Sequence, residues 1–258
     1  MSIKQPIGVF DSGIGGTTVL LELSKILPHE DFIYFADSAN APYGPKSKDE
    51  IRALCCKNVD WLLERDCKLI VVACNTATTN AISYLRDRYK IPFIGIEPAI
   101  KPAALRSKTK QVGVLATEGT LASPLFHKTM QSHASQVEIH EVIGKGLVEY
   151  VEQGDFDSDA LVRLLSSYVN PLLEKKIDYL VLGCTHYPYL KPLLNKLLPK
   201  EISIIDSGLA VAKQTFNILN KLDLNYQFDN TNRQIHFFGN GNTETLNKIQ
   251  KQHFIGII

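Results

Sequence analysis

The sequence lacks any long hydrophobic run. No apolar stretch approaches the roughly 20 residues that a membrane-spanning helix requires, and the segment Met1–Pro6 shows no signal-peptide pattern. We therefore expect a cytoplasmic protein with no membrane partner. An excess of charge of one sign is also absent, because 28 Lys and Arg residues balance 27 Asp and Glu residues, for a formal net charge of +1. This balance gives no electrostatic reason to expect nucleic acid as a partner.

Cysteine is scarce, and its pattern argues against two kinds of site. Five cysteines, an odd number without a secretory signal, indicate reduced thiols rather than a disulfide framework. The chain has no Cys-x-x-Cys pair, and the single Cys-x-His at Cys184 and His186 is too sparse for structural zinc. No lysine stands in a pyridoxal-phosphate context, and no constellation of residues is typical of a metal site. Cys55 and Cys67 are expected to fill the core.

What the sequence does contain is a regular alternation of strand and helix patterns. Short apolar runs bounded by turn residues predict strands at Ile7–Phe10, Phe32–Phe35, Leu69–Ala73, Phe93–Ile96, Val112–Leu115, Val137–Val142, Tyr179–Leu182, Ile202–Ile205 and Ile235–Phe238. Helical periodicity predicts helices near Thr17–Leu27, Asp49–Arg65, Ala77–Tyr89, Ser123–Ser132, Ser158–Lys175, Pro188–Leu198, Leu209–Lys221 and Thr243–Gln252. Asp49 and Ser158 are the expected N-caps of their helices. The alternation predicts an α/β protein of mostly parallel sheets flanked by helices.

The order of the elements suggests an internal duplication. Each half opens with a predicted strand that runs into a polar turn, containing Asp11 in the first half and Thr117 in the second, and each half later has a strand that ends in a cysteine. Chance similarity between two α/β halves is the alternative. We predict one domain of residues 1–97 plus 208–258 and a second of residues 98–207.

The most informative feature is the pair of cysteines at matching places in the two halves. Cys74 follows the apolar run Leu69–Ala73, and Cys184 follows Tyr179–Gly183. Each thiol would therefore lie at the carboxyl end of a strand, the edge where open α/β sheets bind ligands. Two thiols that face one ligand from opposite sides can remove a proton on one face and supply a proton on the other.

A glycine-rich segment, Asp11-Ser12-Gly13-Ile14-Gly15-Gly16, joins the first predicted strand to the first predicted helix. Its glycines expose backbone N–H groups near a helix N-terminus, which suits an anion such as a carboxylate or a phosphate. Thr18 stands where a dinucleotide fingerprint needs glycine or alanine, and no Gly-Lys-Ser/Thr follows, so neither nucleotide motif is present. An ordinary turn, in which Asp11 caps the next helix, is the alternative.

Three further residues are weaker candidates. Tyr43 lies in the loop Ala36–Gly44, which follows the second predicted strand at the same sheet edge. His186 lies two residues after Cys184, where an imidazole can lower the pKa of a thiol or accept its proton; a structural histidine is the alternative. Glu152, near the end of a helix, would ordinarily be assigned to the surface.

Four motifs in register resemble the bacterial glutamate racemases, within the aspartate/glutamate racemase family. They are Asp11–Gly16, Pro42–Gly44, Cys74–Thr78 and Gly183–Pro188, and the likeness extends to Ile205–Gly208. The resemblance implies a cofactor-independent enzyme that interconverts L- and D-glutamate by two-cysteine acid/base chemistry and supplies D-glutamate for peptidoglycan. It also implies two α/β domains related by a pseudo-twofold axis, an active site at their interface, and a homodimer.

The resemblance implies a role for each matching residue. Cys74 and Cys184 are the two acid/base residues, with Cys184 acting on the L-enantiomer and Cys74 on the D-enantiomer. Asp11 assists Cys74, and His186 assists Cys184. Glu152 aligns with a family glutamate near His186, although the segment before it lacks the Cys-Pro and the later Pro common in the family. The predicted substrate-binding set is Asp11, Ser12, Tyr43, Gly44, Asn75, Thr76, Thr117, Thr120, Thr185 and His186.

Three alternatives remain open. A racemase of the same fold that acts on aspartate or another amino acid would use similar chemistry, so the length of the substrate is the main question. A non-catalytic amino-acid-binding protein would need neither thiol. A thiol–disulfide redox enzyme is the weakest alternative, because neither Cys74 nor Cys184 has a nearby resolving partner in the sequence.

Overall fold

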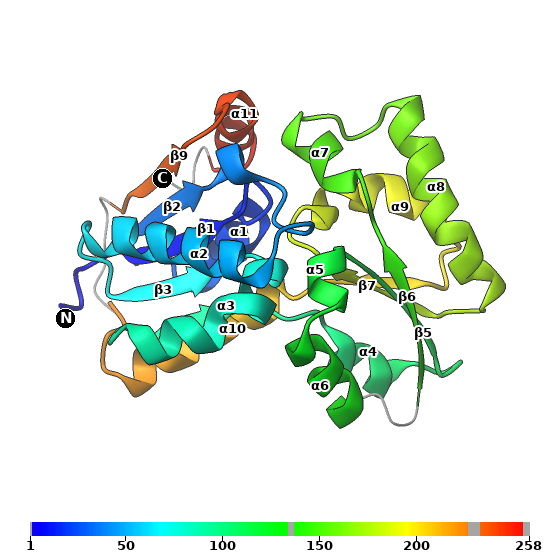
Figure 1. The fold of residues 1–258 in the computed structure, drawn as a ribbon, viewed down its shortest axis with the longest axis horizontal. Coiled ribbons are helices and arrows are strands. Elements are labelled where there is room, and N and C mark those ends of the chain that lie inside the picture. Colours follow the sequence, from blue (N-terminus) through cyan, green and yellow to red (C-terminus); the bar gives the residue numbers. More distant parts are fainter. Residues whose placement is uncertain (1, 134–136, 227–232, 255–258) are drawn as a thin grey trace.

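The computed structural model describes residues 2–133, 137–226 and 233–254. Two lobes lie side by side, each a sheet with helices on both of its faces (Figure 1). Residues 227–232 and 255–258, which the predicted first domain includes, lie outside the described residues. The predicted α/β class is confirmed. None of the described helices is long and apolar enough to cross a membrane.

The strands pair in parallel throughout both sheets. The first sheet has the order β4-β3-β1-β2-β9, with β1 (Ile7–Asp11), β2 (Phe32–Ala36), β3 (Leu69–Val72), β4 (Phe93–Gly95) and β9 (Ile235–Gly239). The second has the order β6-β5-β7-β8, with β5 (Gln111–Ala116), β6 (Glu138–Ile143), β7 (Tyr179–Gly183) and β8 (Ser203–Ile205). All the predicted strands are present. The inner strands β1, β2, β3, β5 and β7 are almost fully buried, and buried parallel strands are short, nearly continuous apolar runs. The outer strands β6, β8 and β9 are partly exposed.

The two sheets repeat one strand order. Reading from the second strand of each half, the orders are β2-β1-β3-β4 and β6-β5-β7-β8, and β9 adds to the first sheet beside β2. The predicted duplication therefore has a topological counterpart. In both halves the cysteine follows the third strand, which lies directly beside the first. This neighbourhood is the point of strand-order reversal, where open sheets place their ligands.

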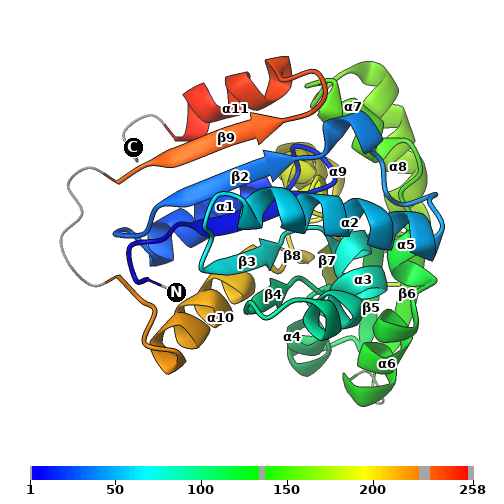
Figure 2. The ribbon, with the colours of Figure 1, turned by 60° about the vertical axis from the view of Figure 1, so that its left-hand side comes forward.

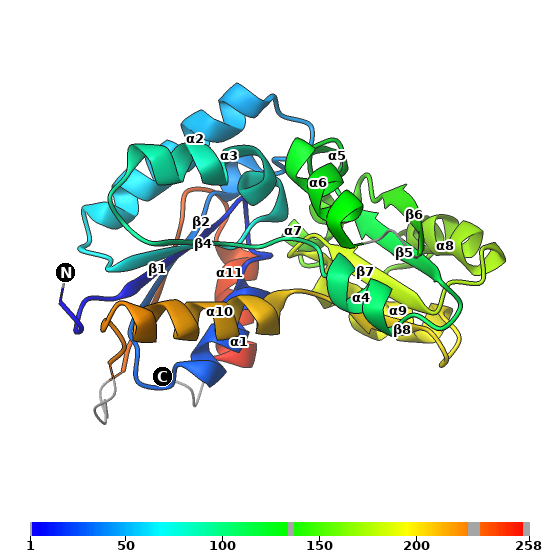
Figure 3. The same ribbon diagram turned by 90° about the horizontal axis from the view of Figure 1, so that it is seen from below.

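Helices cover both faces of each sheet. Around the first sheet lie α1 (Thr17–Ile26), η1 (Ser38–Asn40), α2 (Lys48–Leu63), α3 (Asn75–Arg88), α10 (Gly208–Lys221) and α11 (Glu244–His253). Around the second lie α4 (Ile100–Arg106), α5 (Glu118–Leu121), α6 (Pro124–His133), α7 (Leu147–Glu152), α8 (Asp159–Glu174), η2 (Tyr187–Leu190) and α9 (Lys191–Leu197). In Figure 3, α2 and α3 lie above the first sheet and α1 and α10 lie below it.

Side chains alternate between these layers. Val9 on β1 packs with residues of α1, α10 and α11, whereas its neighbour Phe10 packs with residues of α2 and α3. The core that contains Val9 continues without a break into α7, α8 and α9 of the second half. Cys55 and Cys67 are both buried in the core on the α2 and α3 side, as predicted.

Several predicted helix ends were wrong. Ser47, not Asp49, caps α2, because its side chain accepts the Glu50 N–H while Glu50 bonds back to Ser47 in a capping box. Ser158 caps α8 as predicted. The predicted helix Pro188–Leu198 begins as the 3₁₀ segment η2 before α9. The short helices α4 and α5 were not predicted, and of α7 only a helix end near Glu152 was expected, since four to seven residues show too little periodicity.

The chain crosses between the halves twice, after β4 and after β8 (Figure 3). The two crossings touch, because the Ser207 hydroxyl donates a hydrogen bond to the Glu97 carbonyl oxygen. The division of the chain at 97/98 and 207/208 stays a prediction.

Candidate active site

The site lies where the carboxyl ends of the two sheets meet. In Figure 1 the arrowheads of β2 and β3 point toward the second half. The Thr185 hydroxyl, just after β7, donates to Asp11 Oδ1 at the end of β1 over 3.2 Å. The Thr18 hydroxyl donates to the Thr185 carbonyl over 3.1 Å. These bonds join the loop after Cys184 directly to the glycine-rich segment of the first half.

Asp11 organises that segment from inside. Its side chain is fully buried, and Oδ2 accepts the N–H groups of Gly16 over 2.9 Å and Gly13 over 3.3 Å. Burial raises the pKa of Asp11 to about 6; the Glu152 charge adds to this rise, while the His186 charge and the two backbone N–H groups oppose it. Asp11 thus both shapes the turn and brings a readily titrated carboxyl group into the site.

Asp11→Asn is expected to stabilise the protein while impairing its activity. The folded-state pKa of about 6 exceeds the ordinary 3.8, so the folded state holds its proton more tightly, and stability is lost as pH rises from about 4 through 6. Asparagine is uncharged and has the same shape. At pH 7 we expect its free energy of unfolding to exceed wild type by about 1–3 kcal/mol. Urea unfolding at pH 7 and pH 4 measures this, and a gain that does not shrink at pH 4 would contradict it.

Cys74 lies at the junction of β3 and α3, buried. It is the N-cap of α3, where Sγ accepts the Ala77 N–H over 3.4 Å and donates to Ser12 Oγ over 3.6 Å. Burial and the nearby Asp11 carboxylate raise the pKa of the Cys74 thiol, while the Ala77 N–H and Ser12 oppose the rise. At neutral pH this thiol is protonated, and the helix N-terminus stabilises its anion when the proton leaves.

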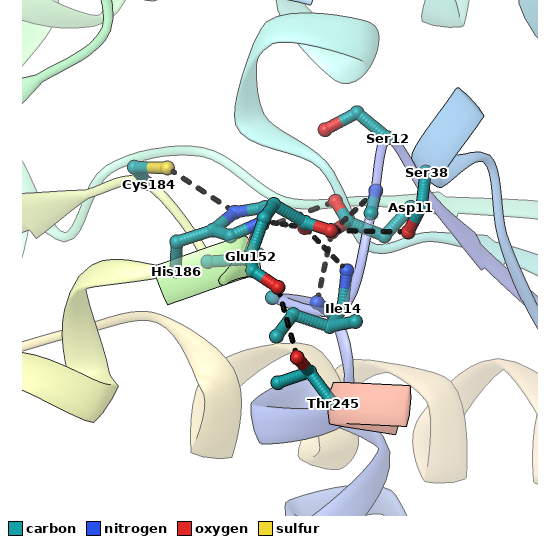
Figure 4. A network of polar contacts seen from close by, with 12 residues as sticks. Asp11, Ser12, Ile14, Ser38, Glu152, Cys184, His186 and Thr245 are labelled. Atoms are coloured by element: carbon teal, nitrogen blue, oxygen red, sulfur yellow. Dashed lines mark hydrogen bonds and ion pairs between the residues drawn. The ribbon is translucent and has the colours of Figure 1, made fainter. Parts of the chain in front are cut away.

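Cys184, at the end of β7, has a different set of partners (Figure 4). Its Sγ lies 3.7 Å from His186 Nδ1, and His186 Nε2 lies 2.5 Å from Glu152 Oε1. Burial would lower the pKa of His186, but Cys184 and Glu152 outweigh it and raise that pKa well above 6.5. Burial would likewise raise the pKa of Glu152, but the His186 contact lowers it. An imidazolium held by a carboxylate therefore faces the Cys184 sulfur.

Gly13 and Gly15 allow His186 and Glu152 to approach the first half. The Ile14 N–H donates to Glu152 Oε1 over 2.7 Å, and the Ser38 hydroxyl donates to Oε2 over 3.1 Å. A Cβ on Gly13 would lie 1.8 Å from Glu152 Oε1, and a Cβ on Gly15 would lie 2.3 Å from His186 Nδ1. The glycine-rich segment is thus required for close contact with Glu152 and His186.

A cluster of hydroxyl groups bridges the halves on the other side. Thr76 Oγ1 of α3 lies 2.7 Å from Thr117 Oγ1 and 3.2 Å from Thr120 Oγ1, and the last two lie 3.0 Å apart. The adjacent Asn75 is buried, and its Nδ2 has no hydrogen-bond partner within the described residues. Since buried donors are normally paired, the unpaired amide at the N-terminus of α3 indicates a place for a polar ligand such as a carboxylate.

The loop Asp37–Gly44 closes the same edge. A Cβ on Gly44 would lie 3.3 Å from Thr117 Cβ, so this loop packs directly on the hydroxyl cluster. The buried Tyr43 hydroxyl donates to Asp37 Oδ2 and accepts from Asn58 Nδ2 over 3.2 Å. The structure therefore places Tyr43 in a buried network behind Gly44, with its hydroxyl already bonded.

Some residues of this network were missed by the sequence reasoning. Ser38 and Asp37 lie in the loop already suspected, and their place after β2 was a usable signal. Thr245 donates to the Glu152 carbonyl oxygen over 2.9 Å, and nothing in the sequence pairs these two residues. The other predicted site residues lie along this interface, from Ser12 and Cys74 to Thr185 and His186.

Two cavities adjoin the interface. One of about 110 Å³ is lined by Gly44, Thr117, Lys145 and neighbouring residues, beside the hydroxyl cluster. Another of about 700 Å³ is lined by Thr18, Tyr189 and residues of α10 and α11, and neither cysteine lines it. Among the described residues, no group of three His, Cys, Asp or Glu could hold a metal ion.

The chain is similar to known proteins over most of its length. The Asp/Glu/hydantoin racemase family matches residues 16–215. The glutamate racemase of Herpetosiphon aurantiacus is 47% identical over 220 residues, which cover 85% of this chain and 87% of that protein. That of Pseudomonas entomophila is 45% identical over 95% of this chain and 92% of its own length.

Solved structures are similar over nearly the whole chain. The glutamate racemase isoform RacE1 from Bacillus anthracis superposes with a TM-score of 0.86 at 32% identity, covering 98% of this chain and 94% of that one. The Escherichia coli glutamate racemase, solved with L-glutamate and the activator UDP-MurNAc-Ala, gives a TM-score of 0.86 at 33% identity, covering 96% and 95%. The Francisella tularensis glutamate racemase, solved with D-glutamate, gives 0.83 at 29% identity, covering 98% and 94%. This chain therefore belongs to the glutamate racemases of the Asp/Glu/hydantoin racemase family and is an isomerase.

Proposed function

We propose that this protein interconverts L- and D-glutamate without a cofactor, by moving the α-proton between Cys74 and Cys184, and that the D-glutamate serves peptidoglycan synthesis. One observation carries the mechanism. Each cysteine follows the third strand of a repeated sheet and has its own partners. These are Ser12 and the Ala77 N–H for Cys74, and His186 for Cys184. A binding protein would need no such separate set around each thiol.

The two sides divide the proton transfer. With L-glutamate, Cys184 acts as the thiolate beside the His186 imidazolium and takes the α-proton, so that the Cα–H bond breaks and an S–H bond forms. The Cys74 thiol then gives its proton to the opposite face of Cα and becomes a thiolate at the N-terminus of α3. The reverse sequence converts D-glutamate. Each turnover exchanges the protonation states of the two cysteines.

The α-proton of an amino acid is far less acidic than a thiol, so the site must stabilise the developing carbanion. Fixed donors in a water-poor site supply such stabilisation without reorganisation. The unpaired Asn75 amide and the hydroxyl groups of Thr76, Thr117, Thr120 and Thr185 are suited to the substrate carboxylates. Asp11, Ser12, Tyr43 and Gly44 complete the proposed binding set.

Glutamate is favoured over aspartate by the relatives. The proteins from E. coli and F. tularensis were solved with L-glutamate and D-glutamate, respectively. We extend this substrate to the present chain, and we further propose a cytoplasmic homodimer whose protomer has domains of residues 1–97 plus 208–258 and 98–207. The Ser207–Glu97 hydrogen bond between the crossings supports boundaries at these positions.

The test is the purified protein with L-glutamate in D₂O and no added cofactor, followed by polarimetry and NMR. We expect optical rotation to disappear as deuterium enters the α-position of the D-glutamate formed. Parallel samples with L-aspartate should stay unchanged. Racemisation of aspartate alone would reassign the substrate, and inertness toward both would favour an amino-acid-binding protein.

A further inference from the structure

We propose that Thr245 is a positioning residue for the reaction, because its hydroxyl fixes the main chain of Glu152 so that the Glu152 carboxylate meets His186. This inference rests on the proposed function and extends the site to the C-terminal helix α11. Thr245 lies beyond residues 16–215, which the racemase family matches. Figure 4 shows it below Glu152, on the side away from Cys184.

The Thr245 hydroxyl binds the Glu152 carbonyl group, which has no hydrogen-bond partner within helix α7. Glu152 is the last residue of α7, and the last carbonyl groups of a helix have no partner within it. Thr245 Oγ1 donates to the Glu152 carbonyl oxygen over 2.9 Å, and Thr245 is buried, with an exposed fraction of 8%. The chain turns at Gly154, two residues after Glu152, where φ is +75°. A Cβ on Gly154 would lie 3.3 Å from Thr245 Cγ2, so this turn packs against Thr245.

Glu152 is thereby held at both ends. Its carboxylate accepts the Ile14 N–H and the Ser38 hydroxyl, and its carbonyl accepts the Thr245 hydroxyl. All three donors belong to elements around the first sheet, whereas Glu152 belongs to the second half. Figure 2 shows the turn between β9 and α11 beside α7. Two anchors, one on the main chain and one at the tip, fix the direction of the side chain toward His186.

A shift of α7 would weaken the 2.5 Å contact between Glu152 and His186. The titratable groups that face His186 are Glu152 from α7, Cys184 directly after β7 and Asp11 from β1. Glu152 is one of the two groups that raise the pKa of His186. Loosening Glu152 must therefore lower that pKa and leave less imidazolium to stabilise the Cys184 thiolate.

The experiment compares three variants of the full chain. Thr245→Val keeps the shape and loses the donor, and Thr245→Ser keeps the donor. Thr243→Val is the matched control, because Thr243 makes no side-chain capping bond. We expect Thr245→Val to lower kcat about tenfold, with KM changed less than twofold, while Thr245→Ser and Thr243→Val keep the wild-type rate.

A second readout is independent of turnover. Histidine-selective ¹⁵N NMR titration, with the His186 signals assigned from His186→Gln, should give a lower His186 pKa in Thr245→Val and a wild-type value in Thr245→Ser. An unchanged His186 titration in Thr245→Val, or a Thr245→Ser variant as slow as Thr245→Val, would overturn the proposal. The titration still decides the matter if the wild type proves inactive on glutamate, which would defeat the proposed function instead.

Folding is checked in the same samples. Trp61 is the one tryptophan of the chain and packs against Phe35 and Phe238, with ring centroids 4.6 and 5.1 Å away. Its fluorescence therefore reports the packing of β9 on the first sheet. Unchanged fluorescence in Thr245→Val assigns the lost activity to the misplaced Glu152. Altered fluorescence in Thr245→Val that Thr245→Ser does not show would assign the lost activity to disrupted packing and contradict the proposal.

Discussion

Cys184→Ala is expected to abolish racemisation while the protein still exchanges the α-proton of D-glutamate with solvent deuterium. The remaining Cys74 can remove and return a proton on its own face, but nothing delivers a proton to the other face. Cys74→Ala should do the reverse and exchange L-glutamate alone. We expect racemisation to fall at least about 10³-fold in each variant, since a positioned acid or base contributes 10²–10⁴-fold. Polarimetry and NMR in D₂O measure both effects.

Exchange is the informative readout for these variants. The two enantiomers have equal free energy, so any active variant must have equal kcat/KM in both directions. A defect on one side therefore cannot appear as a one-directional loss of kcat/KM, but it does appear as exchange into a single enantiomer. The control is Cys55→Ala, which changes a buried core thiol and should keep its activity. Racemisation at the wild-type rate in either Cys74→Ala or Cys184→Ala would contradict the two-base mechanism.

Gly13→Ala is expected to reduce kcat about 100-fold or more, since small misplacements of reacting groups cost that much. The new Cβ would lie 1.8 Å from Glu152 Oε1 and 2.6 Å from Glu152 Cδ, so the carboxylate must leave. Its departure removes the partner that holds the His186 imidazolium beside Cys184. Steady-state kinetics with each enantiomer measures the loss.

A second glycine provides the matched control. Gly239 ends β9, and a Cβ there would meet its nearest atom at 3.4 Å, an ordinary contact. Gly239→Ala should therefore keep kcat within about twofold of wild type. Neither glycine has a positive φ, so alanine is compatible with both backbones. A Gly13→Ala variant with normal kcat would show that the Glu152 contact is not needed for the reaction.

The sequence alone determined the strands, the longer helices and the chemistry-bearing loops. The apolar runs before Cys74 and Cys184 are the buried strands β3 and β7, because a parallel strand covered on both faces is apolar along its whole length. The motifs after those strands carried the family, which the comparisons confirm. Local patterns also gave the α/β class, since turn residues and periodicity report the conformation of the segment that contains them.

The tertiary structure decided which side chains meet. Glu152 read as a surface acid, yet it bonds to Ile14, 138 residues away, and to Thr245, 93 residues away. No local pattern encodes such pairs, because they arise only when two sheets pack with their carboxyl ends together. The same packing buries Asp11 and raises its pKa, and among the described residues it leaves the Asn75 Nδ2 atom without a hydrogen-bond partner. The sequence placed each cysteine at the carboxyl end of a strand with one partner close by in the chain, Ala77 for Cys74 and His186 for Cys184. The fold of each half then brought Ser12 to Cys74 and Glu152 to His186, which distinguishes one thiol from the other.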